Sequence, residues 1–376
     1  MPQPLLAVVS FVREHGLNAL TERYAIKQRR HGVFPNLVLL GYNQVRSPLG
    51  EKVVQQCRGI ILDEADDWRV VSYPFDKFFN RGEPGVASLN WETARVEEKL
   101  DGSLCTWYWY SGQWNVATRG VPDASTPPDG TDIVFAQLFE RTRQALGYQM
   151  PTDPDLCYMF ELMVPENRVV VQHASSRLVL IGARDMRTLA ECALEAQTQW
   201  ENWEVASSFP LRTLDEIVAA AAQLPPIEAE GYVVRDKDFN RIKVKSPAYI
   251  ALAHLKESTT ASVKNILRLV VAHEDAEFLS YFPHLRERFS DVRGRYEALC
   301  QGTDDFLAHL QTQSWVSKGE IARYIAGRPD KAALFALLDG KVADAHEFYA
   351  QQAAQRIETL LVLLHLKEGK TRASDE

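Results

Sequence analysis

In residues 94–110, ARVEEKLDGSLCTWYWY, a charged stretch leads through Lys99 and a glycine-containing turn into a run of aromatic and apolar residues. Two strands joined by a short turn are the structure that such a pattern predicts. Gly102 would let the backbone turn close to a bound ligand, because glycine has no Cβ. The segment therefore indicates a sheet-rich fold with a candidate nucleophile, Lys99, at a turn between strands.

Further strand-like runs lie on both sides of this segment. LVLLGYNQV, RGIILDE and WRVVSYPF precede it, and a hairpin is predicted around Ser111 and Gly112. After an expected helix at residues 132–146 come CYMFELMV, RVVVQ, LVLIGARD, EGYVVRD and NRIKVKS. Residues 4–30 instead have apolar side chains at helical spacing and are expected to form short amphipathic helices. The pattern predicts an α+β domain built on antiparallel sheets.

The pattern changes near residue 250, after which nearly every segment is helical. Val263, Ile266, Leu267 and Val270 recur at one helical spacing, and Ala354, Ile357, Leu361 and Leu364 at another. A chain of 376 residues exceeds the size at which single cores usually stop growing. We expect residues 1–250 to form one domain and residues 251–376 an all-helical C-terminal domain.

Composition excludes several classes of protein. With 46% apolar and 24% charged residues, the chain is typical of soluble globular proteins. No stretch approaches the roughly 18 apolar residues of a membrane span, so no membrane partner is expected. The five cysteines are widely spaced, which predicts reduced thiols and a cytoplasmic location. A net charge of -8 argues against a uniformly basic surface, so any RNA must bind to a local basic groove.

The lysine of KLDGS requires a special setting to act as a nucleophile. Free lysine titrates near pH 10.4, so burial or neighbouring cations must favour the neutral amine at neutral pH. The alternative is an ordinary turn flanked by a lysine and an aspartate. Residue frequencies predict the pattern K-x-D-G in roughly one chain in ten, so the motif by itself is weak.

The segment RIKVKS is a second candidate element. Strand alternation places Arg241, Lys243 and Lys245 on one face and Ile242 and Val244 on the other. Three cations on one face suit a polyphosphate. The alternative is the solvated face of an amphipathic strand.

Two carboxylates and two further cations border apolar strands. Glu161 lies within YMFELMV and Glu230 opens EGYVVR, where an unpaired buried carboxylate would be costly. They could bind Mg²⁺, and a salt bridge is the alternative for each. Arg58 in CRGIILDE and Lys77 in DKFFN are available to an anion, although surface cations are common.

Taken in order, these segments resemble the covalent nucleotidyltransferase superfamily, and within it the phage RNA ligase 1 family that repairs cleaved transfer RNA. KLDGS resembles motif I of that family, FEL motif III, EGYVV motif IV and KVK motif V. RGIILD, PFDKFFN, PENRVVV and LIGARD extend the resemblance over roughly residues 40–250. LIGARD lacks the aromatic residue that stacks on the nucleobase in many other ligases.

The resemblance implies that Lys99 takes the adenylate and that Glu161 and Glu230 serve the ribose and a catalytic metal, Mg²⁺ or alternatively Mn²⁺. Residues matching the family's ATP site are Arg58 and Lys77 for the β and γ phosphates, Lys243 and Lys245 for the phosphates, Arg119 of motif Ia, Val233 against adenine, and Lys99, Asp101, Gly102 and Glu161.

The implied activity is that of an ATP-dependent RNA ligase. Lys99 would attack the α-phosphorus of ATP to form lysyl-AMP, AMP would pass to an RNA 5′-phosphate, and a 3′-hydroxyl would displace it. Its partners would be ATP and RNA ends, such as a nicked tRNA anticodon loop, with a kinase and phosphatase that heal the ends beforehand.

Three alternatives remain open at this stage. A DNA ligase or a capping enzyme shares the lysine chemistry but normally has a downstream barrel of short strands, whereas residues 251–376 are expected to be helical. A catalytically inactive RNA-binding relative is disfavoured by the intact motif residues.

The helical domain could recognise RNA through its arginines at positions 286, 288, 293 and 295. Glu287, Asp291 and Glu297 alternate with them, however, so a salt-bridged surface is favoured there.

Overall fold

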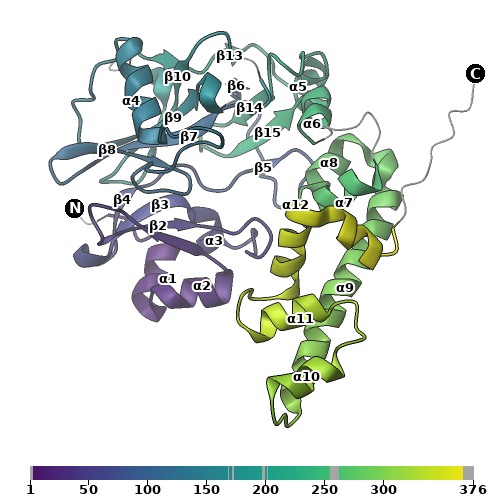
Figure 1. Ribbon diagram of the computed structural model, residues 1–376. Helices are drawn as coiled ribbons and strands as arrows, with labels where there is room; N and C mark the ends of the chain where they lie inside the picture. Colours follow the sequence, from purple (N-terminus) through teal and green to yellow (C-terminus); the bar gives the residue numbers. More distant parts are fainter. Residues whose placement is uncertain are drawn as a thin grey trace, which may run out of the picture. The chain divides into compact units, whose positions relative to one another are not determined.

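The computed structural model describes residues 3–167, 169–171, 173–196, 200, 202–254 and 262–366 (Figure 1). The chain divides into two compact units, Met1–Ala253 and His254–Glu376. Three sheets lie in the first unit, and the second is helical throughout its described part. The predicted α+β class is confirmed.

A four-stranded antiparallel sheet begins the first unit. Its strands, in spatial order, are β1 Lys27–Arg30, β2 Leu37–Gly41, β3 Arg58–Asp63 and β4 Arg69–Ser72. Helices α1 Ala7–His15, α2 Leu17–Tyr24 and α3 Lys52–Gln56 accompany it (Figure 1). Val38 and Leu40 share a buried cluster with α1, whereas Leu37 and Leu39 pack toward the second sheet. The prediction of helices up to residue 30 is wrong for Lys27–Arg30, which form an exposed edge strand.

The second sheet contains the long hairpin that follows the KLDGS segment. Its main path is β11 Glu191–Cys192, β10 Arg177–Asp185, β9 Leu156–Met163, β7 Ser103–Tyr110 and β8 Gln113–Thr118, with β12 Glu204–Val205 parallel to β10. Helix α4 Phe135–Ala145 packs on one face through Leu138 and Phe139. The predicted turn is confirmed, with positive φ at both Ser111 and Gly112, the geometry of a two-residue hairpin loop.

The third sheet has five strands. Its order is β13 Ser208–Phe209, β6 Arg95–Lys99, β14 Gly231–Arg235, β15 Arg241–Lys245 and β5 Phe79–Asn80, with β5 parallel to β15. Val96, Val234 and Ile242 bury one face against helix α5 Leu214–Ala222. The alternation predicted in RIKVKS is therefore confirmed, since Ile242 lies on the opposite face from the three cations.

The prediction of a strand at RVVVQ is wrong for those of its residues that the structure describes. Residues 169–171 form no strand. The backbone N–H groups of Val170 and Val171 instead donate to the Asp101 carboxylate at 2.9 and 2.7 Å. This β-branched segment does not form a strand, because its backbone N–H groups donate to the buried Asp101 carboxylate and not to a neighbouring strand.

The second unit consists of helices α7 Val263–Val271, α8 Asp275–Tyr281, α9 Arg286–Thr312, α10 Lys318–Tyr324, α11 Lys331–Leu338 and α12 Ala345–Leu363, and α6 Pro247–His254 spans the junction. The stripe predicted for α12 is wrong at Ala354, which is exposed while Ala353 is buried, since a kink at Arg356 interrupts the helix. Arg293 pairs with Asp275, and Arg295 with Asp291 at 3.0 Å, so two of the four predicted arginines are salt-bridged.

Two further expectations concern the whole chain. All five cysteines are free, as predicted. Within the described residues, no helix has the length and apolarity needed to cross a membrane.

Candidate active site

The third sheet brings the predicted residues together in rows. Across strands β6, β14 and β15, one row contains Lys99, Gly231 and Lys245, and the next contains Glu97, Val233 and Lys243. Residues directly opposite in antiparallel strands project from the same face. Motifs that lie more than 130 residues apart in the chain therefore meet on one surface.

Lys99 is ion-paired to Glu230 at the end of β6. The Lys99 Nζ atom lies 2.6 Å from Glu230 Oε2, and Lys245 Nζ lies 3.4 Å from Oε1 of the same carboxylate. The Glu230 side chain is only 5% exposed. Because an uncompensated buried charge is costly, two cations sharing this carboxylate form a stable arrangement.

Gly231 is required for this arrangement. Its φ is +151°, and a Cβ there would lie 2.2 Å from the Val244 carbonyl oxygen. Any side chain would push β15 away from β14. The glycine thus keeps Lys245 within reach of Glu230.

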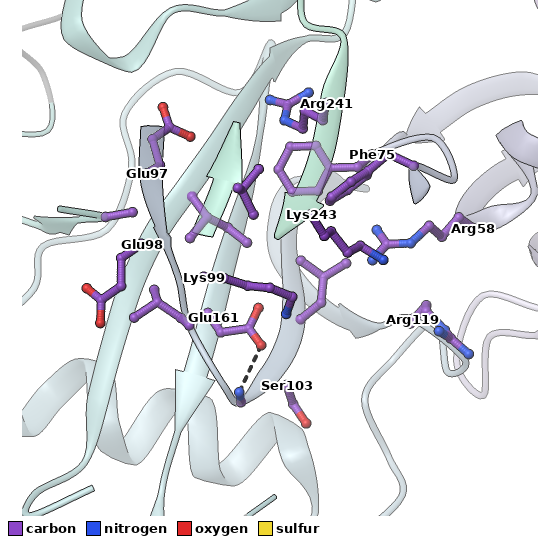
Figure 2. Close-up of a pocket in the computed structure, with 17 residues that line it drawn as sticks. Arg58, Phe75, Glu97, Glu98, Lys99, Ser103, Arg119, Glu161, Arg241 and Lys243 are labelled. Atoms are coloured by element: carbon purple, nitrogen blue, oxygen red, sulfur yellow. Dashed lines mark hydrogen bonds between the residues drawn. The ribbon is translucent and has the colours of Figure 1, made fainter. Parts of the chain in front are cut away.

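A pocket of about 360 Å³ opens beside Lys99. Predicted residues that line it are Arg58, Lys99, Gly102, Arg119, Glu161, Val233 and Lys243. Apolar side chains, among them Leu104 and Ile181, complete the lining. Figure 2 shows Glu97 and Glu98 on one side of the pocket and Arg58, Arg119 and Lys243 on the other. A pocket that is partly apolar and partly cationic suits an anion bearing a flat apolar group, such as a nucleotide.

Glu161 is held by the turn that follows Lys99. The Gly102 N–H donates to Glu161 Oε1 at 3.1 Å (Figure 2). Burial, against the opposing charge of Lys99 and with the added repulsion of Glu230, raises the pKa of the Glu161 carboxyl to about 7. The predicted cost of a carboxylate in an apolar strand thus appears as a raised pKa.

Gly102 itself has a structural task that the sequence did not reveal. A Cβ there would lie 2.5 Å from the Leu162 carbonyl oxygen on β9. The glycine is therefore needed for close packing of the turn on β9 and also for access to the pocket.

Replacing Glu161 with glutamine is expected to stabilise the ligand-free protein at pH 8. A carboxyl whose folded pKa is raised from 4.5 to about 7 binds its proton more tightly when folded, so stability falls as pH rises from 4.5 to 7. Glutamine removes this penalty, worth about 1–3 kcal/mol. Thermal melting should show a higher Tm for Glu161→Gln at pH 8 and no gain at pH 4.5; an equal gain at both would contradict the assignment.

Lys243 lies at the centre of a group of cations. Burial, and then the charges of Lys77, Arg58, Lys99 and Lys245, lower its pKa well below the usual value. Its Nζ lies 4.8 Å from the centre of the Phe78 ring. Arg58 Nη1 is buried without a hydrogen-bond partner. Converging cations and a donor without an acceptor form a site built for an anion.

Binding of a triphosphate is expected to raise the lowered pKa of Lys243 and so to draw protons onto its amine. An anion next to this ammonium favours its charged form, so up to about one proton should be taken up. Calorimetry with α,β-methylene ATP at pH 8, in buffers of different ionisation enthalpy, measures this uptake. At that pH Glu161, with its pKa of about 7, is largely ionised and adds little. Lys243→Met should abolish the buffer dependence, and equal enthalpies for the wild type in all buffers would refute the idea.

Four predicted residues lie outside the pocket lining: Glu230, which pairs with Lys99 as described above, and Asp101, Lys77 and Lys245. The Asp101 carboxylate accepts the Val170 and Val171 N–H groups and, at 2.7 Å, the Tyr249 hydroxyl, so it fastens the protein's own segments. Lys77 lines a neighbouring pocket, with Nζ 4.6 Å from the Phe79 ring centre, and acts on Lys243 by its charge. Lys245 acts through Glu230.

Arg241, the third RIKVKS cation, lines the pocket as the alternation predicts, but it is already ion-paired there. Its guanidinium is 2.6 Å from Glu191 Oε2 and lies 4.6 Å from the Phe75 ring centre. Glu191 also pairs with Arg184 at 3.1 Å. Sequence reasoning missed Glu191, because nothing in β11 marks it. It named PFDKFFN but not Phe75 and Phe78 as lining residues, although aromatic rings beside a lysine are a usable signal.

The carboxylates near the pocket fit a metal that uses few protein ligands. Among the described residues no group of three or more metal-ligating side chains occurs. Glu161 and Glu230 are the two carboxylates that act on each other beside Lys99. Mg²⁺ is commonly bound by one or two carboxylates together with substrate phosphates. The donor set therefore fits a metal that arrives with a nucleotide.

Comparison with known proteins places the chain in a family. The profile of a family described as RNA ligase matches residues 56–249, about half of the chain. The chain is similar to the RNA ligase of Rhodothermus phage RM378, at 26% identity over 80% of this chain and 85% of that protein. It is also similar to the "Putative bifunctional polynucleotide kinase/RNA ligase" of Autographa californica nuclear polyhedrosis virus, at 29% identity over 75% of this chain, and it spans 42% of that protein's length.

Among solved structures, an archaeal ATP-dependent RNA ligase matches 99% of this chain and 93% of its own, with 14% identity and a TM-score of 0.46. The site rests on the geometry above and not on this distant likeness.

Proposed function

Because the chain belongs to the RNA ligase family, we propose that the protein is an ATP-dependent RNA ligase that adenylates itself on Lys99 and then joins an RNA 5′-phosphate to a 3′-hydroxyl. The observation that carries the proposal is the pocket in which Lys99 lies beside Lys243 and the unpartnered Arg58 Nη1. A nucleophile next to an anion site is the arrangement that nucleotidyl transfer requires.

In this reaction the triphosphate occupies the cationic side of the pocket. Arg58 and Lys243, with Lys77 behind them, stabilise negative charge on the transferring and leaving groups. Adenine lies against the apolar residues Ile181 and Val233, both of which line the pocket. Ile181, in LIGARD, stands in the region where other ligases have an aromatic residue.

Glu230 keeps the charge of the site balanced while AMP is transferred to Lys99. Lys99 must leave its ion pair and lose a proton before its amine can attack phosphorus. The Lys99 side chain loses its positive charge with that proton, and it stays neutral in the phosphoramidate that forms as pyrophosphate leaves. Because Glu230 also pairs with Lys245, its carboxylate keeps a counter-charge throughout.

A divalent ion, Mg²⁺ or Mn²⁺, held by Glu161 and Glu230 would supply Lewis-acid stabilisation of phosphate charge. Glu161, with a pKa of about 7, changes its protonation state near neutral pH. Binding of the ion would favour the ionised carboxylate.

Residues 1–250 are the proposed nucleotidyltransferase domain, and the helical residues 251–376 a domain that recognises RNA, for which repair of a cleaved tRNA is the proposed role. A separate kinase and phosphatase would prepare the ends. The similar viral protein, whose name joins a kinase to an RNA ligase, supports this division of labour.

The proposal is tested by following labelled AMP. Protein incubated with α-labelled ATP and Mg²⁺ should become covalently labelled, and after removal of ATP the label should move onto 5′-phosphorylated RNA and be released as AMP on sealing. Transfer to RNA but not to DNA of the same sequence supports an RNA ligase. Equal transfer to DNA would favour a DNA ligase, and absence of labelling, with protein free of pre-bound AMP, would favour the non-catalytic alternative.

A further inference from the structure

An RNA end held at Lys99 must leave the pocket over one of its walls, and the walls differ in charge. Glu97 and Glu98 line the pocket on the side of β6, whereas Arg58 and Arg119 lie on the other side (Figure 2). Arg119 is exposed at this side. Phosphate is attracted by cations and repelled by carboxylates, so the strand is expected to leave past Arg58 and Arg119.

The four-stranded sheet continues that wall outward. Arg58 on β3 is opposite Gly41 on β2, and Gly41 is opposite Lys27 on β1. Opposite residues share a face, so Lys27 projects from the same face as Arg58, about 10 Å away across two strand spacings. Gly41, between them, adds no side chain that would block a path. Arg29 follows on the same face of β1, opposite Leu39.

Strand β1 has the charge and exposure of a phosphate-binding surface. All four of its residues are exposed. Arg30, on the other face, pairs with Glu64 at 2.6 Å. Among the described residues no acidic side chain forms an ion pair with Lys27 or Arg29. Residues 1–31 contain five Lys or Arg and two Glu in a chain of net charge -8, so this segment is locally basic.

We propose that Lys27 and Arg29 of β1 bind the phosphate backbone of the RNA strand whose 5′-phosphate end lies at Lys99, continuing the cationic wall formed by Arg58 and Arg119. The inference rests on the proposed function. The contacts are with phosphates, so the surface holds RNA regardless of base sequence and fixes the direction in which the strand leaves the pocket.

A structural explanation competes with this proposal. Charged side chains on an exposed edge strand also prevent it from pairing with another chain. That role requires only charge at the edge and predicts self-association, not weaker RNA binding, when the charge is removed.

The test compares the Lys27→Gln/Arg29→Gln double variant with an Arg212→Gln/Lys237→Gln control. The control changes two exposed cations on the same unit and alters net charge equally. Both proteins are first loaded with labelled AMP, since a normal yield shows that fold and ATP site are intact. Binding of a 5′-phosphorylated 12-nucleotide RNA and of a 5′-phosphorylated dinucleotide is then measured over a range of salt concentrations.

The β1 variant should bind the 12-nucleotide RNA roughly tenfold more weakly, with a salt slope smaller by about 1.4 for two lost phosphate contacts on a single strand. Dinucleotide binding should be unchanged, because it depends on the pocket alone. Affinity and slope equal to the control would overturn the proposal, and dimerisation with unchanged affinity would assign Lys27 and Arg29 to edge protection. If the wild type forms no lysyl-AMP, the proposed function fails; normal lysyl-AMP with unchanged RNA affinity overturns the β1 surface alone.

Discussion

Lys99→Ala is expected to abolish transfer of AMP from ATP to the protein, by more than about 10⁴-fold, because no other group can take over the role of the nucleophile. Lys243 also lines the pocket, but in the proposed mechanism its amine contacts the phosphates. The measurement is covalent labelling with α-labelled ATP under single-turnover conditions. Lys99→Arg should be equally inactive, since it keeps the charge beside Glu230 but not a nucleophilic amine.

A second substrate separates loss of the nucleophile from loss of the fold. RNA that already carries AMP on its 5′-phosphate does not need Lys99, so Lys99→Ala should still seal it. Lys237→Ala, at an exposed position that does not line the pocket, should retain both activities. Label on Lys99→Ala, or failure of every variant to seal the pre-adenylated RNA, would disprove the assigned role.

The rows of functional side chains could be predicted because they follow from local pattern. A strand has a period of two, so RIKVK places Lys243 and Lys245 together wherever the strand lies. Glu161 could be noticed because a carboxylate inside YMFELMV must have a reason to be there. The structure adds that Gly102 meets this carboxylate and that its pKa rises to about 7.

Ion pairs and hydrogen bonds between residues far apart in the chain could not be predicted from the sequence. Arg241 was grouped with the phosphate-binding lysines because its strand position is right, yet Glu191, fifty positions earlier, neutralises it. Asp101 belongs to the most recognisable motif, but its carboxylate holds Val170 and Val171 instead of lining the pocket. Neither pairing has a local signal, since each depends on how separate segments of the fold come together.

The edge strand β1 shows a different limit of pattern reasoning. Lys27–Arg30 has no apolar residue, so it gave no alternation and was assigned to the preceding helical region. An edge strand exposed on both faces needs only backbone pairing to β2. The polarity that gave this strand no sequence signal is also what the proposed RNA-binding surface depends on.

Glu230→Gln is expected to reduce adenylation at least about 100-fold, because it removes a metal ligand and the counter-charge of Lys99 in one change. The rate of covalent labelling should fall and require more Mg²⁺ or Mn²⁺ to recover. Lys237→Gln is the exposed control and should label like the wild type. Full labelling at the usual metal concentration would exclude Glu230 from the first step.

The effect on stability should separate Glu230 from Glu161. Glu230 is paired to two cations, so glutamine leaves Lys99 and Lys245 without their carboxylate and should lower the Tm at pH 8. Glu161 is penalised when ionised, so the same substitution should raise the Tm there. Both variants are expected to lose activity, but with opposite changes in stability. If both variants shifted the Tm in the same direction at pH 8, it would be wrong to describe Glu230 as stabilised by its ion pairs and Glu161 as destabilising when ionised.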